Sequence, residues 1–162
     1  MIDSEEILNG STMKLTKKIK AAISDSVLCW LATSSADNIP NVSPKEIFSC
    51  FGENMIIVAN IASPQTVKNI QQNKHICISF IDILKQKGFQ LKGEAEIITA
   101  ASKEYPKMEN VLLVLTEGKF PFNSITKINV TSAKPIIAPK YILFPETTEE
   151  DQIASAKKNY GF

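Results

Sequence analysis

Several residues that could bind an anion meet at Ser63, where a helix is expected to begin. An N-cap serine there precedes Pro64, and proline is favoured at the first helical position. The first N–H groups of a helix have no partner within it, and together with the helix dipole they attract negative charge. The hydroxyls of Ser63 and Thr66 add donors, and Lys45 and Lys68 could bring positive charge. The alternative is an ordinary N-cap followed by an ordinary first turn.

A second group of polar residues lies along the strand expected at 39–51. Asn41, Ser43 and Lys45 share one face of it, because side chains in a strand alternate with a period of two. Pro40 and Pro44 argue against a central, fully paired position, so an edge or a bulge near a ligand is expected. The alternative for this polar face is simple exposure to solvent.

Three further polar residues are candidates for the same site. Asn60 ends a buried strand just before Ser63, and Gln90 and Lys92 share one face of the strand expected at 89–98. Clean alternation makes an exposed strand face the rival explanation for Gln90 and Lys92.

Other kinds of catalytic chemistry find little support. The single histidine, His75, fits a surface or turn position, and it cannot by itself supply a catalytic triad or a metal site. We interpret Cys29, Cys50 and Cys77 as reduced, buried thiols in strands. No G-x-G-x-x-G follows a strand, and no paired carboxylates suggest hydrolysis. The chain has no arginine, so lysine, hydroxyls or backbone N–H groups must meet any anion.

Length and composition indicate a globular protein. The 162 residues, 44% of them hydrophobic, are enough to bury a core without a metal or a disulfide. A net charge of +1 gives no footprint for nucleic acid, and no run approaches the ~20 apolar residues of a membrane span. The acidic start of the chain lacks the apolar stretch of a signal peptide. We therefore expect a soluble, cytoplasmic protein that binds neither nucleic acid nor a membrane.

The hydrophobic pattern predicts a few helices among many short strands. Helices are expected after a cap at Ser11 or Thr12, after Ser63, at 106–116 with Met108, Val111, Leu112 and Leu115 inward, and in the tail, with Thr148 as cap and Gly161 as stop. Strands are expected at 27–32, 39–51, 55–60, 75–84, 89–98, 124–131 and 136–144. Trp30 lies in an apolar run that is expected to be buried on both faces, so core packing is its predicted role.

This pattern favours a mainly β protein with covering helices, of α+β class. Many short strands suggest a closed or nearly closed antiparallel barrel with Greek-key-like connections. Residues 1–146 are expected to form the barrel domain, and 147–162 a helical tail packed on the same domain.

Three segments in a fixed order resemble the FMN-binding split-barrel family, relatives of pyridoxamine 5′-phosphate oxidase. The first joins Leu31-Ala32-Thr33 to Pro40-Asn41-Val42-Ser43-Pro44-Lys45. The second joins Val58-Ala59-Asn60 to Ser63-Pro64-Gln65-Thr66, and the third is Gly88-Phe89-Gln90-Leu91-Lys92-Gly93-Glu94-Ala95. The resemblance runs from about residue 15 to 144 and implies a split barrel.

The resemblance also implies a cofactor and a partner. It implies FMN, with the phosphate at the start of the helix after Ser63, and the cofactor-binding residues Asn41, Ser43, Lys45, Asn60, Ser63, Thr66, Lys68, Gln90 and Lys92. It further implies a homodimer with cofactor clefts at the interface, and a flavin-dependent oxidoreductase acting on a small-molecule redox substrate. No residue identifies a proton donor, so no catalytic residue is named.

Two alternatives keep the same fold. One is a non-catalytic dimer that binds or senses a flavin or haem, and the other is a binding module with an empty pocket. The chain departs from the family where Gln65 stands beside the expected phosphate, in place of lysine or arginine. It also lacks the arginine segment that binds substrate in pyridoxamine 5′-phosphate oxidase, which argues against that specific activity.

Overall fold

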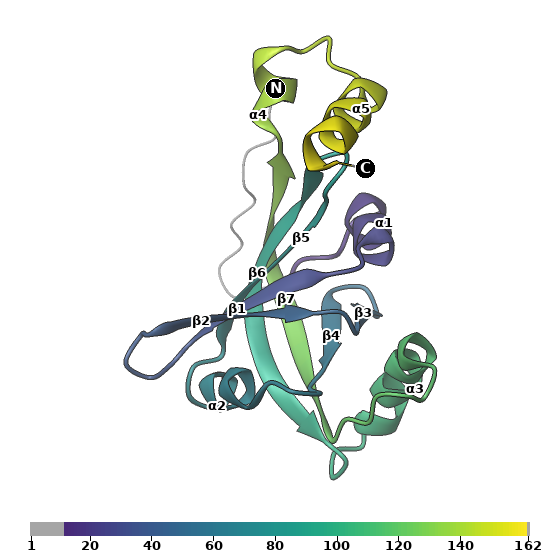
Figure 1. Ribbon diagram of the computed structural model, residues 1–162. Helices are drawn as coiled ribbons and strands as arrows, with labels where there is room; N and C mark the ends of the chain where they lie inside the picture. Colours follow the sequence, from purple (N-terminus) through teal and green to yellow (C-terminus); the bar gives the residue numbers. More distant parts are fainter. Residues whose placement is uncertain (1–11, 162) are drawn as a thin grey trace.

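Seven antiparallel strands form one curled sheet in the computed structural model, which describes residues 12–161. Their order is β2-β1-β5-β6-β7-β4-β3, with bounds β1 (Cys29–Ser34), β2 (Pro40–Lys45), β3 (Phe48–Phe51), β4 (Met55–Ala59), β5 (His75–Asp82), β6 (Lys87–Thr99) and β7 (Ser124–Ile137). Only Glu46 and Ile47 join the two edge strands β2 and β3. Since consecutive Cα atoms are about 3.8 Å apart, these edges lie within about 11 Å of each other, and the sheet curls into an open, split barrel. The expected barrel is confirmed (Figure 1).

Five helices occur in the described residues: α1 (Lys17–Asp25), α2 (Pro64–Gln72), α3 (Tyr105–Thr116), α4 (Pro139–Leu143) and α5 (Glu149–Tyr160). We call the sheet face that carries Leu31 and Ile78 the inner face; α1 and α2 contribute Ile19, Ile23 and Ile70 to its core. On the other, outer face, α3 packs over the end of the sheet furthest from α4 and α5 (Figure 1). None of the helices in residues 12–161 combines the length and apolarity that a membrane span requires.

The single strand expected at 39–51 is wrong, because the structure contains two strands there. β2 ends at Lys45 and β3 begins at Phe48, at the opposite edge of the sheet. A hydrogen bond fixes the backbone where the chain crosses between the two edges: the carbonyl of Ile47 accepts from the N–H of Ala59 at 3.0 Å. The expected edge position of the proline-containing part is confirmed, because β2 pairs only with β1.

The two strands expected at the end of the barrel are also wrong. One strand, β7, runs from Ser124 to Ile137, and residues 139–143 form the short helix α4 instead of a strand. The long strand β6 gives β7 a partner along its whole length, with a bulge beside Gly93. Pro135 is tolerated because β7 has a second neighbour, β4, only as far as Asn129.

Two local expectations near the N-terminus are corrected. The first helix is capped by Thr16 and not by Thr12, since the Thr16 hydroxyl accepts the N–H of Ile19 at 3.2 Å; Ser11 lies outside the described residues. Trp30 is 47% exposed and does not fill the core. It lies on the outer face of β1 and lines a surface hollow with Ile81 and Lys157, while its neighbours Cys29 and Leu31 are fully buried on the inner face.

The two later helices largely follow their patterns. In α3, Met108 and Leu112 are fully buried as expected, whereas Leu115 is 46% exposed and was wrongly expected in the core. In α5, Thr148 forms the expected cap, with a reciprocal hydrogen bond to Asp151, and Gly161 ends the helix with a φ of 80°. The helix contacts the start of β6, where Lys87 pairs with Glu149 at 2.9 Å. The division into a barrel domain and a tail stays a prediction.

Candidate functional site

The start of α2 has an N-cap residue that does not cap. The Ser63 hydroxyl makes no hydrogen bond to the first turn of the helix; it accepts one from the ammonium of Lys45. Pro64 has no N–H, and within the described residues the N–H groups of Gln65 and Thr66 have no hydrogen-bond acceptor. Two oriented backbone donors and a hydroxyl therefore stay available at the positive end of the helix dipole.

Lys45 is a buried cation with no counterion among residues 12–161. Its side chain is only 5% exposed, and no carboxylate in the described residues forms an ion pair with it. Burial lowers the pKa of Lys45, and its cross-strand neighbour Cys29 opposes this only in part. Burial also raises the pKa of Cys29 to about 12, so its thiol is uncharged at neutral pH and cannot balance the ammonium. An anion at this point would supply the missing negative charge.

Side-chain hydrogen bonds continue along the contact between α2 and the sheet. The hydroxyls of Ser43 and Thr66 are 3.1 Å apart, and the amide of Asn69 donates to Thr33 Oγ1 at 3.0 Å. Asn41 donates to the same Thr33 oxygen at 3.4 Å. Ser63 contacts Lys45, Thr66 contacts Ser43, and Asn69 contacts Thr33, the β1 residue that pairs with Asn41. The helix therefore runs antiparallel to β2. We call these contacts the α2 ladder: Lys45–Ser63, Ser43–Thr66 and Asn69–Thr33.

The structure thus brings together four of the candidate residues directly, and a fifth, Asn41, through Thr33. The sequence pattern does not by itself point to Thr33 and Asn69 as members of this group. The available signal was the spacing of three from Ser63 to Thr66 to Asn69, which places one more polar side chain on the buried face of the helix. The role of any of these residues in binding a cofactor stays a prediction.

Asn60 and Lys68 lie beside this group without joining it. The side chain of Asn60 donates to Ser124 Oγ at 3.2 Å and accepts from Thr126 Oγ1 at 2.9 Å, which ties the entry to α2 to strand β7. Lys68 is exposed and forms no ion pair with the described residues. Two residues after Thr66, it projects about 200° around the helix from the ladder, by the 3.6-residue period.

Gln90 and Lys92 lie on the opposite face of the sheet. Residues paired across antiparallel strands point to the same side, and Ser43, Leu31, Ile78 and Leu91 form one such row on the inner face. Gln90 pairs with Ser79, which pairs with Trp30, so its row lies on the outer face. Within one chain, Gln90 and Lys92 therefore cannot complete the site built around Lys45.

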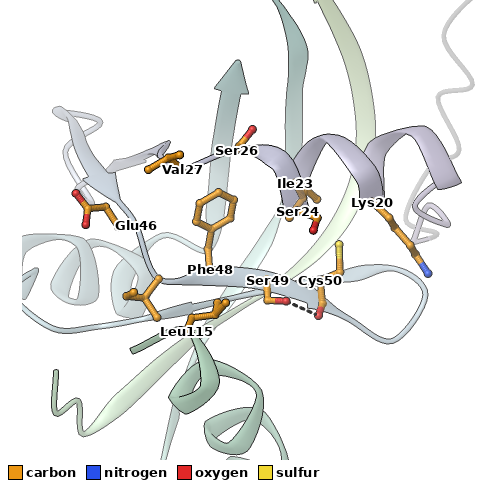
Figure 2. Close-up of a pocket in the computed structure, with 11 residues that line it drawn as sticks. Lys20, Ile23, Ser24, Ser26, Val27, Glu46, Phe48, Ser49, Cys50 and Leu115 are labelled. Carbon is orange, nitrogen blue, oxygen red and sulfur yellow. Dashed lines mark hydrogen bonds between the residues drawn. The ribbon is translucent and has the colours of Figure 1, made fainter. Parts of the chain in front are cut away.

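Two hollows in the surface lie apart from the α2 ladder. One, of about 460 Å³, lies between α1, β3 and α3, with Phe48 amid its labelled residues and Leu115 on the α3 side (Figure 2). The other, of about 640 Å³, has mostly apolar walls that include Trp30 and Ile81. None of the nine candidate residues lines either hollow. In residues 12–161, no cluster of histidine, cysteine and acidic side chains could hold a metal ion.

Comparison with known proteins places these features in a family context. The family described as pyridoxamine 5′-phosphate oxidase matches residues 15–134. Among solved structures, HupZ of Group A Streptococcus is 26% identical with a TM-score of 0.64, over 74% of this chain and 91% of HupZ. An FMN-binding protein from Syntrophomonas wolfei subsp. wolfei is 16% identical with a TM-score of 0.64, over 75% of this chain and 86% of that one.

A protein from Clostridium acetobutylicum, related to general stress protein 26 and of the pyridoxinephosphate oxidase family, is 17% identical with a TM-score of 0.59. That likeness covers 76% of this chain and 91% of the other. No curated protein matches the sequence. At such identities, the likenesses to the Syntrophomonas and Clostridium proteins show a shared fold, which is the split barrel.

Proposed function

Since the chain belongs to the pyridoxamine 5′-phosphate oxidase family, we propose that it binds FMN and acts as a flavin-dependent oxidoreductase on a small-molecule substrate. The observation that carries the proposal is the buried ammonium of Lys45, which has no counterion in the described residues and lies at the start of α2. A cytoplasmic location is part of the proposal, and the three free cysteines support it.

The residues at this point fit a phosphate. Lys45 offers a charge, Ser63 and Thr66 offer hydroxyls, and the first turn of α2 offers the N–H groups of Gln65 and Thr66. Without arginine, the site holds its anion by a point charge and single donors and not by a bidentate fork. The polar side chains of Ser43 and Asn41 continue from there along β2 and could bind the ribityl chain. FMN, when bound, supplies the redox chemistry, and the protein supplies binding, orientation and exclusion of water.

The proposal includes a homodimer with shared sites. Its support is the placement of Gln90 and Lys92 on the outer face, away from Lys45 and Ser63. If all of these residues bind the cofactor, Gln90 and Lys92 must serve the site of a second copy. The outer face of the sheet also exposes Trp30 and Val42, apolar surface of the kind that subunit contacts cover.

The direct experiment is to record the visible spectrum of the purified protein before and after addition of FMN. Bands near roughly 375 and 450 nm that remain with the protein on gel filtration would support the proposal. Their absence even after FMN addition would refute it. Reduction of the bound FMN by NADH or NADPH separates an oxidoreductase from a protein that only stores or senses the flavin.

The paired substitution of Ser63 and Thr66 by alanine is expected to weaken FMN binding about 10-fold, because two hydroxyl donors to the phosphate are lost. Riboflavin, which has no phosphate, should bind to the variant and to the wild type with similar affinity. Fluorescence titration with both flavins measures the effect. An unchanged FMN affinity would show that the phosphate is not at this helix end.

Shared sites can be tested by complementation between two variants, Lys45→Met and Gln90→Ala. Each homodimer should bind FMN weakly. A mixed dimer, isolated with two different tags, should regain about one tight site per two chains, because one of its sites receives both intact residues. A mixed dimer that binds as weakly as its parents would place Lys45 and Gln90 in the same chain's site. A Gln90→Ala homodimer that binds FMN as tightly as the wild type would show that Gln90 belongs to no site.

A further inference from the structure

Asn69 is a buried polar residue with two side-chain hydrogen bonds, and packing of the core does not require a polar side chain at its position. It lies in the middle of α2 and is 1% exposed. Its amide donates to Thr33 Oγ1 at 3.0 Å, and its carbonyl oxygen accepts from Gln65 Nε2 at 2.7 Å. An apolar side chain would fill this place without needing hydrogen bonds, so the polar choice calls for a reason.

The reason lies in how few buried apolar residues hold α2 against the sheet. Of its nine residues only Thr66, Asn69 and Ile70 are buried, and Ile70 is the one apolar residue among them. Apolar contacts are non-directional and leave a helix free to rotate or slide by small amounts, whereas hydrogen bonds have narrow geometry. The α2 ladder therefore determines the rotation of the helix and the distance of its first turn from β2. Of the three contacts in the α2 ladder, Asn69–Thr33 lies furthest from the proposed phosphate.

We propose that Asn69 is a positioning residue for phosphate binding, which holds the first turn of α2 in register with Lys45 and Ser43. The proposal rests on the proposed function, since it assigns the phosphate to this helix end. Asn69 itself touches no ligand: it acts through Thr33 on one side and through Gln65, in the first turn of the helix, on the other. Its loss should therefore reduce the preference for FMN over riboflavin and leave riboflavin binding nearly unchanged.

The test measures the ratio of the riboflavin and FMN dissociation constants in Asn69→Leu, Thr33→Val and the double variant. Leucine has the same number of side-chain heavy atoms as asparagine with the same branching, and Thr33 retains its bond from Asn41, so Asn69→Leu leaves few buried groups unpaired. We expect each single variant to lower the ratio by roughly fivefold, with riboflavin affinity changing less than about twofold. The double variant should be no worse than Asn69→Leu, because both changes break the same bond. Thr33→Val tests the same bond should Asn69→Leu fail to fold.

Asn73→Ala is the matched control. Asn73 follows the last turn of α2 and donates to Ser34 Oγ at 2.8 Å, so it makes the same kind of bond to β1 at the other end of the helix. The Asn73→Ala variant should have a lower melting temperature and an unchanged ratio of the riboflavin and FMN dissociation constants. An unchanged ratio in Asn69→Leu and Thr33→Val, or an equal loss in Asn73→Ala, would overturn the proposal. A wild-type protein that binds FMN no better than riboflavin would instead refute the assignment of the phosphate itself.

Discussion

Lys45→Met is expected to stabilise the protein in the absence of FMN and to weaken FMN binding by about 10- to 100-fold. Methionine has a similar length but removes a charge that is 5% exposed and has no counterion in the described residues. Relief of that desolvation should raise the free energy of unfolding by about 1 kcal/mol or more. The same charge is the one we assign to the phosphate, so its loss removes a charge-assisted hydrogen bond from the complex.

The lowered pKa of Lys45 adds a pH signature to this variant. Because the pKa in the folded state lies below its ordinary value of 10.5, the unfolded state binds more protons between those two values. The stability of the wild type should therefore rise with pH through this alkaline window, and Lys45→Met should lack that contribution. Urea unfolding at a series of pH values, compared between the two proteins, measures it.

Lys107→Met is the control for the removal of one positive charge. Lys107 is exposed on α3, remote from the α2 ladder, and should change neither stability nor FMN affinity by much. If Lys45→Met destabilised the protein, or bound FMN as tightly as the wild type, Lys45 would be a structural residue and not an anion-binding one.

Gly93→Ala should destabilise the protein by about 3 kcal/mol, because the sheet has no room for a methyl group at that position. A Cβ added to Gly93 would lie 2.3 Å from the carbonyl oxygen of Asn129 in β7. Gly93 also borders the bulge in the pairing of β6 with β7, so neither strand can move away without breaking ladder hydrogen bonds. For a chain of this size the melting temperature should fall by roughly 6–12 °C.

Glu94→Ala, at the next residue of β6, provides the comparison. It removes only an exposed ion pair with Lys74, at 2.9 Å, and should cost less than about 1 kcal/mol. Thermal unfolding followed by circular dichroism measures both variants. A Gly93→Ala protein as stable as the wild type would show that the two strands do not approach each other this closely.

The α2 ladder shows how far the sequence could predict the site. Alternation along β2 and the Ser63-Pro64 helix start were enough to group Ser43 and Lys45 with Ser63 and Thr66, because both rules act over a few residues. They could not identify Thr33, since its place opposite Asn69 depends on the docking of a helix onto a strand far from it in the chain. They also gave no means of separating Gln90 from Lys45, which requires the register of four strands.

The wrong predictions about the fold have the same origin, since each depends on contacts between segments far apart in the chain. Trp30 was expected in the core because its run is apolar, but which face of a strand is covered depends on helices elsewhere in the chain. Glu46 and Ile47 carry no turn signal, so nothing local showed that the chain crosses there from one sheet edge to the other. The continuation of β7 through Pro135 likewise depends on the length of its partner β6.

The pairing of β4 with β7 has a consequence for synthesis of the chain on the ribosome. Ile56 and Val58 are fully buried in the finished protein, and the strand that completes their side of the sheet begins at Ser124. β7 begins 65 residues after β4 ends at Ala59, so the β3–β4 hairpin is made well before its partner strand. The apolar face of this hairpin therefore stays uncovered until β7 has been made. A nascent chain stalled before β7 would expose that face to aggregation or to chaperones.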